Sequence, residues 1–365
     1  MPEVVLTVNG KRHSGWKSVS VSSSMKSLAM SFDVSFSDRW PGQQEKYVIQ
    51  EGSRVNLSLN GQTVLTGWVD RMSPSYDTQS HSLTLSGRDL TCDLVDCSYI
   101  GDKVDFAGEE LLTIAKALCD PFNITVTSET DISGQLAKAR YGQGESVHAF
   151  LLKLCRLKGV LPISYGDGRL VLATAGSQSS GGSLEQGANI KTASANFDSS
   201  RRFSEYRVKG QGTPPMQFDW PDPNQDEKER LENRRQFVSP KGVATDKAVK
   251  RYRPLVLIAE GAAAPADMEA RASWEAVNRA GQSRGASYTV TGWGPKAGQF
   301  WRINQKVSVQ DPILGLSGRY LIESVRLSQD ESGGTVSSLS VVHPDAYAAK
   351  PKADKASDIK SFFDK

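Results

Sequence analysis

The fold is decided by Arg54-Val-Asn-Leu-Ser-Leu59, Leu65-Thr-Gly-Trp-Val-Asp-Arg-Met72 and His81-Ser-Leu-Thr-Leu-Ser-Gly87. Apolar and polar residues alternate in these runs, which is typical of half-buried β-strands. The succession returns as Lys306-Val-Ser-Val309, Tyr320-Leu-Ile-Glu-Ser-Val-Arg-Leu327 and Thr335-Val-Ser-Ser-Leu-Ser-Val341. Trp68-Val69-Asp70-x-Met72 then aligns with Leu321-Ile322-Glu323-x-Val325. The repeat predicts two similar β modules, and it favours a protein that builds a symmetric object over one that performs a reaction.

Length and composition indicate a folded protein of two to four domains, since 365 residues exceed one ordinary core. Hydrophobic residues make up 38% and charged residues 23%, as in globular proteins. The net charge of +3 is too small to supply a global field for nucleic acid or an acidic membrane. The N-terminus lacks the basic start and apolar run of a signal peptide, and no stretch approaches the ~20 apolar residues of a membrane span.

Residues 1–100 read as the first β-barrel module. Leu28 to Phe36 alternates cleanly, so one face of that strand should pack while the other stays wet. Asn60-Gly61 predicts a tight turn. Residues 101–175 read as a small α+β domain, with helices over 109–119 and 146–157, a strand over 123–127 and a hairpin over 161–173.

The remainder predicts a flexible linker or loop at 176–202, because that segment is rich in glycine and serine. A second β-barrel module then covers 203–345 and includes a long loop at 213–253 and a helix at 264–281. Residues 346–365 form a C-terminal tail. The expected fold class is therefore mainly β with an α+β insertion: two similar β-barrel modules plus a small α+β domain.

Catalytic and metal-binding patterns are weak in this sequence. Cys92, Cys97, Cys119 and Cys155 form no paired Cys-x-x-Cys arrangement, and free core cysteines explain them better than zinc. The four histidines are scattered. Gly210-Gln-Gly212 and Gly292-Trp-Gly294 lack the third glycine and following helix of a dinucleotide site. No enzyme activity, metal or cofactor is expected.

One charge cluster, residues 227–253, holds nine basic and four acidic side chains. It can be a solvated surface with Glu–Arg pairs, or a patch that meets an acidic partner or passing nucleic acid. Phe218 and Trp220, just before it, can anchor a neighbouring subunit or pin their own loop. The candidate partner or lumen contacts are Phe218, Trp220, Arg234, Arg235, Lys250, Arg251 and Arg253.

A resemblance to a known family rests on the order of several motifs. The start Met1-Pro-Glu-Val-Val-Leu-Thr-Val-Asn-Gly-Lys11, Trp16 and Phe32-Asp-Val-Ser-Phe36 resemble the N-terminus of a phage tail protein. With Gly67-Trp-Val-Asp70 and Leu83-Thr-Leu-Ser-Gly-Arg-Asp89, the chain resembles the baseplate hub proteins of Mu-like contractile-tail phages. It is more distantly similar to the late control protein D family and the N-terminal part of VgrG spike proteins. The resemblance extends to about Tyr347.

The resemblance implies a structural protein of the virion, with host cytoplasm as its location during assembly. It implies a homotrimeric ring with pseudo-sixfold symmetry that joins the tail tube to the spike and passes DNA during ejection without sequence-specific binding. The implied partners are copies of itself, a separate central spike protein, the tail tube and other baseplate proteins, with no stable membrane association.

Two other functions stay open. A cell-wall hydrolase would use carboxylates such as Asp70 or Glu323, which occupy matching places in the repeat. A host-glycan-binding tail module would stack exposed tryptophans on sugar rings, with Trp16, Trp40, Trp293 and Trp301 as candidates.

Overall fold

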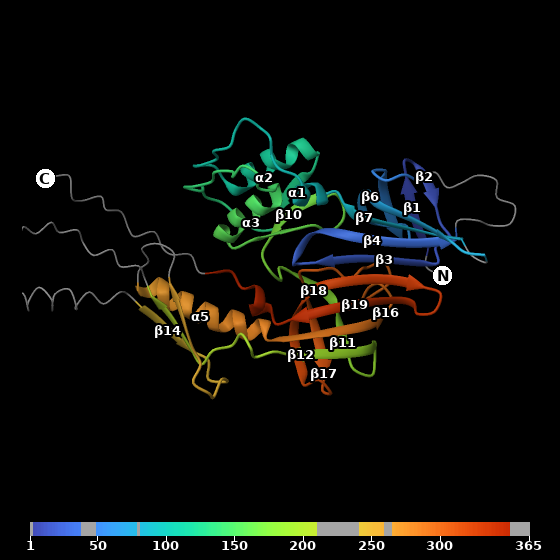
Figure 1. Cartoon of the computed structure of the whole chain (residues 1–365). Coiled ribbons are helices and arrows are strands. Elements are labelled where there is room, and N and C mark those ends of the chain that lie inside the picture. Colours follow the sequence, from blue (N-terminus) through green and yellow to red (C-terminus); the bar gives the residue numbers. More distant parts are fainter. Residues whose placement is uncertain (1–2, 38–48, 79–80, 210–240, 259–264, 351–365) are drawn as a thin grey trace, which may run out of the picture. The chain divides into compact units, whose positions relative to one another are not determined.

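The protein is described by a computed structural model that covers residues 3–37, 49–78, 81–209, 241–258 and 265–350 (Figure 1). The chain divides into two compact units: unit 1 comprises Met1–Asn196 and Arg284–Pro344, and unit 2 comprises Phe197–Ser283 and Asp345–Lys365. Strands make up most of the regular structure, as the alternation of the sequence predicts.

The first β module of unit 1 contains the strands β1 (Val4–Val8), β2 (Lys11–His13), β3 (Ser18–Ser24), β4 (Ser27–Ser37), β5 (Arg54–Leu59), β6 (Gln62–Tyr76) and β7 (His81–Asp89). They hydrogen-bond in the order β3-β4-β7-β6-β5-β1-β2. Asn60 and Gly61 both have positive φ, 50° and 76°, so the predicted tight turn joins β5 to β6. The alternation of β4 places Met30, Phe32 and Val34 in the core of unit 1.

An α+β domain follows, built of α1 (Cys92–Asp96), α2 (Leu111–Cys119), η1 (Asp120–Phe122), β8 (Thr125–Ser128), α3 (Val147–Lys158), β9 (Leu161–Ile163) and β10 (Arg169–Ala173). Its sheet has the order β8-β10-β9. Ser146 caps α3 by accepting a hydrogen bond from Ala149 N at 3.3 Å, and Gly159 ends the helix in the left-handed conformation. The two longer helices begin and end within two residues of the ranges predicted from the sequence.

The second β module contains β11 (Gln178–Glu185), β12 (Ile190–Phe197), β16 (Arg284–Thr291), β17 (Gln305–Asp311), β18 (Leu316–Asp330) and β19 (Gly334–Val342). The linker predicted at 176–202 is wrong, because β11 and β12 occupy it. Backbone hydrogen bonds to β17 hold β11, and Leu184 is fully buried, so the segment is a strand despite its glycines and serines.

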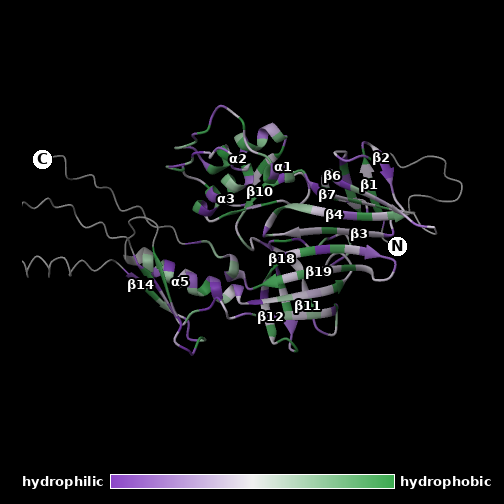
Figure 2. Cartoon of the chain, in the orientation of Figure 1, coloured by the Kyte–Doolittle hydropathy of each residue, from purple (hydrophilic) through white to green (hydrophobic). Residues whose placement is uncertain are grey.

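Unit 2 holds a three-stranded sheet of β13 (Glu205–Lys209), β14 (Lys241–Thr245) and β15 (Pro254–Ile258), in the order β14-β13-β15. Helix α5 (Pro265–Gln282) packs on it through Met268 and Ala272 against Tyr206 and Val208. Gly242 permits this approach, since an added Cβ would lie 2.1 Å from the Met268 carbonyl carbon. Figure 2 shows purple and green bands alternating along α5, so hydrophilic and hydrophobic residues follow one another in this helix.

Two expectations for residues 203–345 need correction. β13, β14, β15 and α5 form a unit of their own, whereas the second β module takes its first two strands from 178–197. The long loop placed at 213–253 contains strand β14, which pairs with β13 from Lys209↔Lys241 to Glu205↔Thr245. The helix was placed correctly.

Candidate functional site: two open sheet edges and a serine-rich face

The two predicted triplets of strands have the same register. β5 pairs with β6 at Arg54↔Trp68, and β17 pairs with β18 at Lys306↔Leu321. Each middle strand then carries one extra residue against its next neighbour. In β6 the extra residue is Asp70, and in β18 it is Glu323. The acids that align in the sequence therefore occupy equivalent β-bulges, a feature that kinks a strand and increases its twist.

The correspondence extends beyond these triplets. One module has the strand order β3-β4-β7-β6-β5-β1, and the other has β12-β16-β19-β18-β17-β11. Both sets also follow the chain in the same succession, with β1 matching β11 and β7 matching β19. One difference lies at the outer strand, because β1 is antiparallel to β5 whereas β11 is parallel to β17. The two modules therefore share one strand topology.

The modules join through backbone pairing. The second half of β18 pairs antiparallel with β3, from Ser324↔Ser24 to Asp330↔Ser18. The equivalent half of β6, residues 71–75, pairs with β7 on one side and with no described strand on the other. β12, the counterpart of β3, pairs only with β16 within the described chain. Among the described strands, two edges equivalent to the internal junction are thus open.

One face of the joined sheet carries mainly hydroxyl side chains. The opposite face is apolar and forms the core of unit 1. Cross-strand partners on the hydroxyl face run as Thr289, Ser338, Arg326, Ser22 and Ser31 across five strands. We call the following side chains the serine face: Ser18, Ser20, Ser22, Ser24, Ser27, Ser31, Ser35, Ser82, Thr84, Ser86, Ser287, Thr289, Ser324, Ser328, Ser338 and Ser340.

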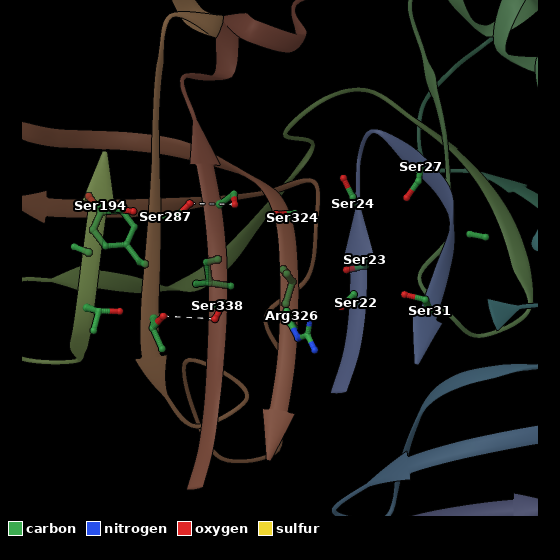
Figure 3. A pocket seen from close by; sticks show the side chains of 18 residues that line it. Ser22, Ser23, Ser24, Ser27, Ser31, Ser194, Ser287, Ser324, Arg326 and Ser338 are labelled. Carbon is green, nitrogen blue, oxygen red and sulfur yellow. Dashed lines mark hydrogen bonds between the residues drawn. The ribbon is translucent and has the colours of Figure 1, made fainter. Parts of the chain in front are cut away.

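A hollow of about 490 Å³ lies on the serine face at the junction of the modules. Figure 3 shows Ser194 and Ser287 on one side of it and Ser24 and Ser27 on the other, with Arg326 between. The Arg326 guanidinium donates a hydrogen bond to Ser20 Oγ at 3.1 Å. Small hydroxyl groups on both sides leave the hollow open.

The charged groups beside the serine face are largely compensated. Arg88 contacts Asp70 at 2.6 Å and Asp96 at 2.8 Å. Hydrogen bonds to the two acids raise the pKa of Arg88, and the bond from Arg88 lowers the pKa of Asp96. Asp33 accepts hydrogen bonds from Ser86 Oγ at 2.8 Å and Ser20 Oγ at 3.5 Å.

A buried carboxylate ties the first module to the α+β domain. Asp89 at the end of β7 is fully buried. It accepts hydrogen bonds from Thr91 N at 3.1 Å, from Thr91 Oγ at 2.6 Å and from the Ser164 hydroxyl. Burial raises the pKa of Asp89, although these hydrogen bonds oppose the shift.

The candidate contacts predicted from charge divide into two groups. Phe218, Trp220, Arg234 and Arg235 lie outside the described residues. Lys250, Arg251 and Arg253 lie together between β14 and β15 in unit 2. Lys250 and Arg251 are exposed.

Arg253 contributes to its own unit instead. Its guanidinium lies 5.0 Å from the centre of the Phe203 ring and donates to the Ser200 carbonyl, and its backbone N donates to Ser204 Oγ at 2.9 Å.

The serine face was not predicted from the sequence. The pattern that could have indicated it is serine, in place of charged residues, at alternate positions of β3 and β4.

The geometry weakens both alternative functions. Glu323 pairs with Lys26 at 2.8 Å, as Asp70 pairs with Arg88, so each acid of the repeat has a local structural partner. Trp293 and Trp301 are 5% and 3% exposed and belong to the core, which removes them as sugar-stacking surfaces. Trp16 is partly buried and donates to the Val4 carbonyl at 3.2 Å. Trp40 lies outside the described residues.

In the described part of the chain, no three histidine, cysteine or acidic side chains are grouped as metal ligands. Cys92, Cys119 and Cys155 are buried, and burial raises the pKa of each thiol to about 12. No helix among the described residues is long and apolar enough to cross a bilayer.

Family models match three parts of the chain. Residues 3–89 match the N-terminal domain of the Mu phage baseplate assembly protein GpP-like family. Residues 91–174 match the second domain of the baseplate hub protein gp44-like family. Residues 264–350 match the fourth domain of the Mu phage baseplate assembly protein GpP family. The first two matches coincide with the first β module and the α+β domain.

Individual relatives agree with these matches. The baseplate hub protein gp44 of Escherichia phage Mu is 30% identical over 356 residues, which is 96% of this chain and 90% of that protein. The crystal structure of the 43 kDa tail protein of prophage MuSo2 from Shewanella oneidensis has a TM-score of 0.80 and 33% identity, covering 95% of this chain and 99% of the other. A tail protein from Neisseria meningitidis MC58 shares the fold, with a TM-score of 0.75 and 22% identity over 96% and 99%.

Proposed function

This chain belongs to the family of baseplate hub proteins of Mu-like phages, and we propose that it forms a homotrimeric ring at the centre of the baseplate. The ring joins the tail tube to the central spike protein, contacts other baseplate proteins, and lets DNA pass during ejection. Its role is structural, in the virion tail, after assembly in the host cytoplasm. Membership of the family supports the place in the baseplate, and the edges of β6 and β12 support the ring.

The junction between β18 and β3 carries the argument for the ring. It already joins two copies of one module inside a single chain. The outer half of β6 corresponds to the half of β18 in that junction, and β12 corresponds to β3. An unpaired strand edge is a template for another strand. If β6 of one chain pairs with β12 of the next, the internal junction is repeated between chains.

Three chains joined in this way would place six modules around one axis. Alternate junctions would lie within and between chains, which gives pseudo-sixfold symmetry from a trimer. Such a ring can face a sixfold tube on one side and a threefold spike on the other. We also propose that Lys250 and Arg251 contact an acidic surface of a neighbouring baseplate protein, since both side chains are exposed.

The oligomeric state tests the ring. Sedimentation equilibrium should give three times the 39.7 kDa of one chain, with a mass that falls on dilution toward the monomer. A stable monomer at high concentration would contradict the proposal.

Cysteine cross-linking tests the edges. In a Cys97→Ser background, Ser73→Cys combined with Thr192→Cys or Ser194→Cys should give covalent dimers and trimers on mild oxidation. Arg326→Cys with Ser22→Cys is the matched control, because these residues are opposite each other within one chain. This pair should form a disulfide inside the chain and give no covalent dimer. Ser73→Cys with Gln135→Cys should give no product. Cross-linking of that last pair alone would place the subunit contact elsewhere.

A second candidate function finds little support. A glycan-binding module needs exposed aromatic rings, and two of the four candidate rings are in the core. Binding of the purified protein to host polysaccharide would revive that function.

A further inference from the structure

We infer that the serine face is the wall of the ring's opening, and that this neutral hydroxyl surface lets the phosphate backbone of duplex DNA slide past without being retained. The inference rests on the proposed ring and deepens it, because it assigns the wall and the chemistry of what passes along it.

The layering of unit 1 determines which face can turn inward. On the apolar side of the sheet, the core includes residues of β1, β5, β11 and β17, and also Ile163 and Val171 of the α+β domain. That side is already occupied by a second layer. The serine face carries no described element over it, and it continues from β16 to β7 across the junction of the two modules.

The hollow indicates concavity in the same direction. It lies on the serine face where the two modules meet, and its lining comes from β12, β16, β19, β18, β3 and β4. A sheet that closes into a ring must curve so that one face is concave along its whole length. Repeating the junction between chains would continue the curvature, and the hydroxyl side chains would then encircle the opening.

The residue types fit passage better than binding. Each lysine or arginine that neutralises a phosphate adds salt-dependent affinity for DNA, so a basic wall would hold the DNA. A strongly acidic wall would repel it. Serine hydroxyls can donate and accept hydrogen bonds, so they keep water on the wall and exchange bonds with phosphate oxygens.

The charges on this surface are few and of both signs. Arg71, opposite Ser86, and Asp330, opposite Ser18, add one of each sign. Arg88 is held by two aspartates, and Asp33 is held by serine hydroxyls. Arg326 is exposed, and its guanidinium donates to Ser20. The serine face therefore presents isolated charges among hydroxyls, not a continuous basic track.

Adding lysines to the wall tests the inference. Ser27 and Ser287 are exposed on β4 and β16, on either side of the hollow, and neither contributes to the core. The variant Ser27→Lys/Ser287→Lys places about six lysines in a trimeric opening. Its affinity for a short DNA duplex should fall roughly 10³-fold between 50 and 200 mM salt, as expected for about six phosphate contacts. The wild-type ring should show no measurable retention, and virions carrying the variant should release DNA more slowly.

Two controls separate charge from size and position. Ser27→Gln/Ser287→Gln adds neutral bulk at the same sites and should behave as wild type. Thr113→Lys/Gln135→Lys adds the same charge at exposed positions of the α+β domain and should not retain DNA in a salt-dependent way. If the glutamine and lysine variants slow release equally, the wall senses bulk and not a polyanion, and the inference fails.

The failure of the inference is distinguishable from failure of the ring. Sedimentation of each variant shows whether the trimer forms. Intact rings whose wall lysines do not increase DNA retention would overturn the neutral wall while leaving the hub function in place. Absence of rings in the wild type would overturn both.

Discussion

The first and second β modules have the same strand order but end differently. In the second module the outer half of β18 is paired with β3, whereas the equivalent half of β6 meets no described strand on that side. β6 carries Pro74 at the place where β18 carries Leu327. Proline has no N–H to donate, and it protects an edge from indiscriminate pairing. The same strand is therefore paired within the chain in the second module, and in the first module it is an edge that carries a proline.

The modules also differ in the residues that lie opposite the bulge. At the bulge of the first module, Val69 is opposite Gly87, and in the second Ile322 is opposite Val341. The first module is further tied to an α+β domain through Asp89. Topology and register are thus shared by the two modules, while the side chains of each differ with its neighbours.

Truncating one core leucine in each module should have the largest effect. Leu85 and Leu339 are opposite Met72 and Val325 at equivalent positions, and both are buried. Leu85→Ala and Leu339→Ala should each lower the free energy of unfolding by about 2–5 kcal/mol. Urea titration of both variants provides the measurement. A cost in one module and none in the other would break the equivalence.

A methyl group at Gly87 should have the next largest effect, and it should sharpen the difference between the modules. A Cβ there would lie 2.0 Å from the Trp68 carbonyl oxygen and 2.6 Å from Phe32 Cε1. Gly87→Ala should therefore cost about 1–3 kcal/mol through overpacking. Thermal unfolding at constant pH tests this, with Gly285→Ala in β16 as the control, because an added Cβ there would lie no closer than 3.6 Å to its nearest neighbour, the Val341 carbonyl oxygen. An unchanged midpoint for Gly87→Ala would show that the strands can separate there without cost.

Replacing Asp89 should have a smaller effect, which depends on pH. Asp89→Asn keeps the shape but alters the hydrogen bonds from Thr91 and Ser164, at a cost of roughly 1 kcal/mol. Folding raises the pKa of Asp89, so protonation of Asp89 stabilises the folded state. This contribution is fully present below the ordinary pKa of 3.8 and is lost progressively as the pH rises through the folded pKa. The advantage of the wild type over Asp89→Asn should therefore be larger at pH 4 than at pH 7.

Urea titrations at both pH values measure that difference. Ser337→Ala is the control variant, because the buried Ser337 hydroxyl donates to the Gly292 carbonyl at 2.6 Å and has no group that titrates between these pH values. An advantage that grows with pH would reverse the assigned direction of the pKa.

The smallest effects are expected at the two bulge acids. Asp70 and Glu323 each hold a basic side chain at the surface, and surface pairs contribute roughly 0–1 kcal/mol. Asp70→Asn and Glu323→Gln should each cost less than about 1 kcal/mol, and the cost should shrink in high salt. Costs well above that range would mean that the acids define the bulges themselves.

The sequence predicted the repeated strands, because alternation of apolar residues is a local signal that the core of unit 1 then satisfies. It also aligned Asp70 with Glu323, although not their position in bulges, since a bulge depends on the partner strand. β11 escaped prediction because its Gly-Ser composition resembles a linker and backbone pairing with β17 supplies its stability. The serine face escaped because a wet face has meaning only after neighbouring strands are placed side by side.

The structure of the assembled ring is the most direct test of the central claim. A reconstruction of the purified protein by electron cryomicroscopy should resolve three chains around an open centre, with residues 71–75 of β6 paired to β12 of the next chain and Ser22, Ser287 and Ser338 facing the opening. Closed rings held by other edges, or particles whose serine residues face outward, would contradict the account.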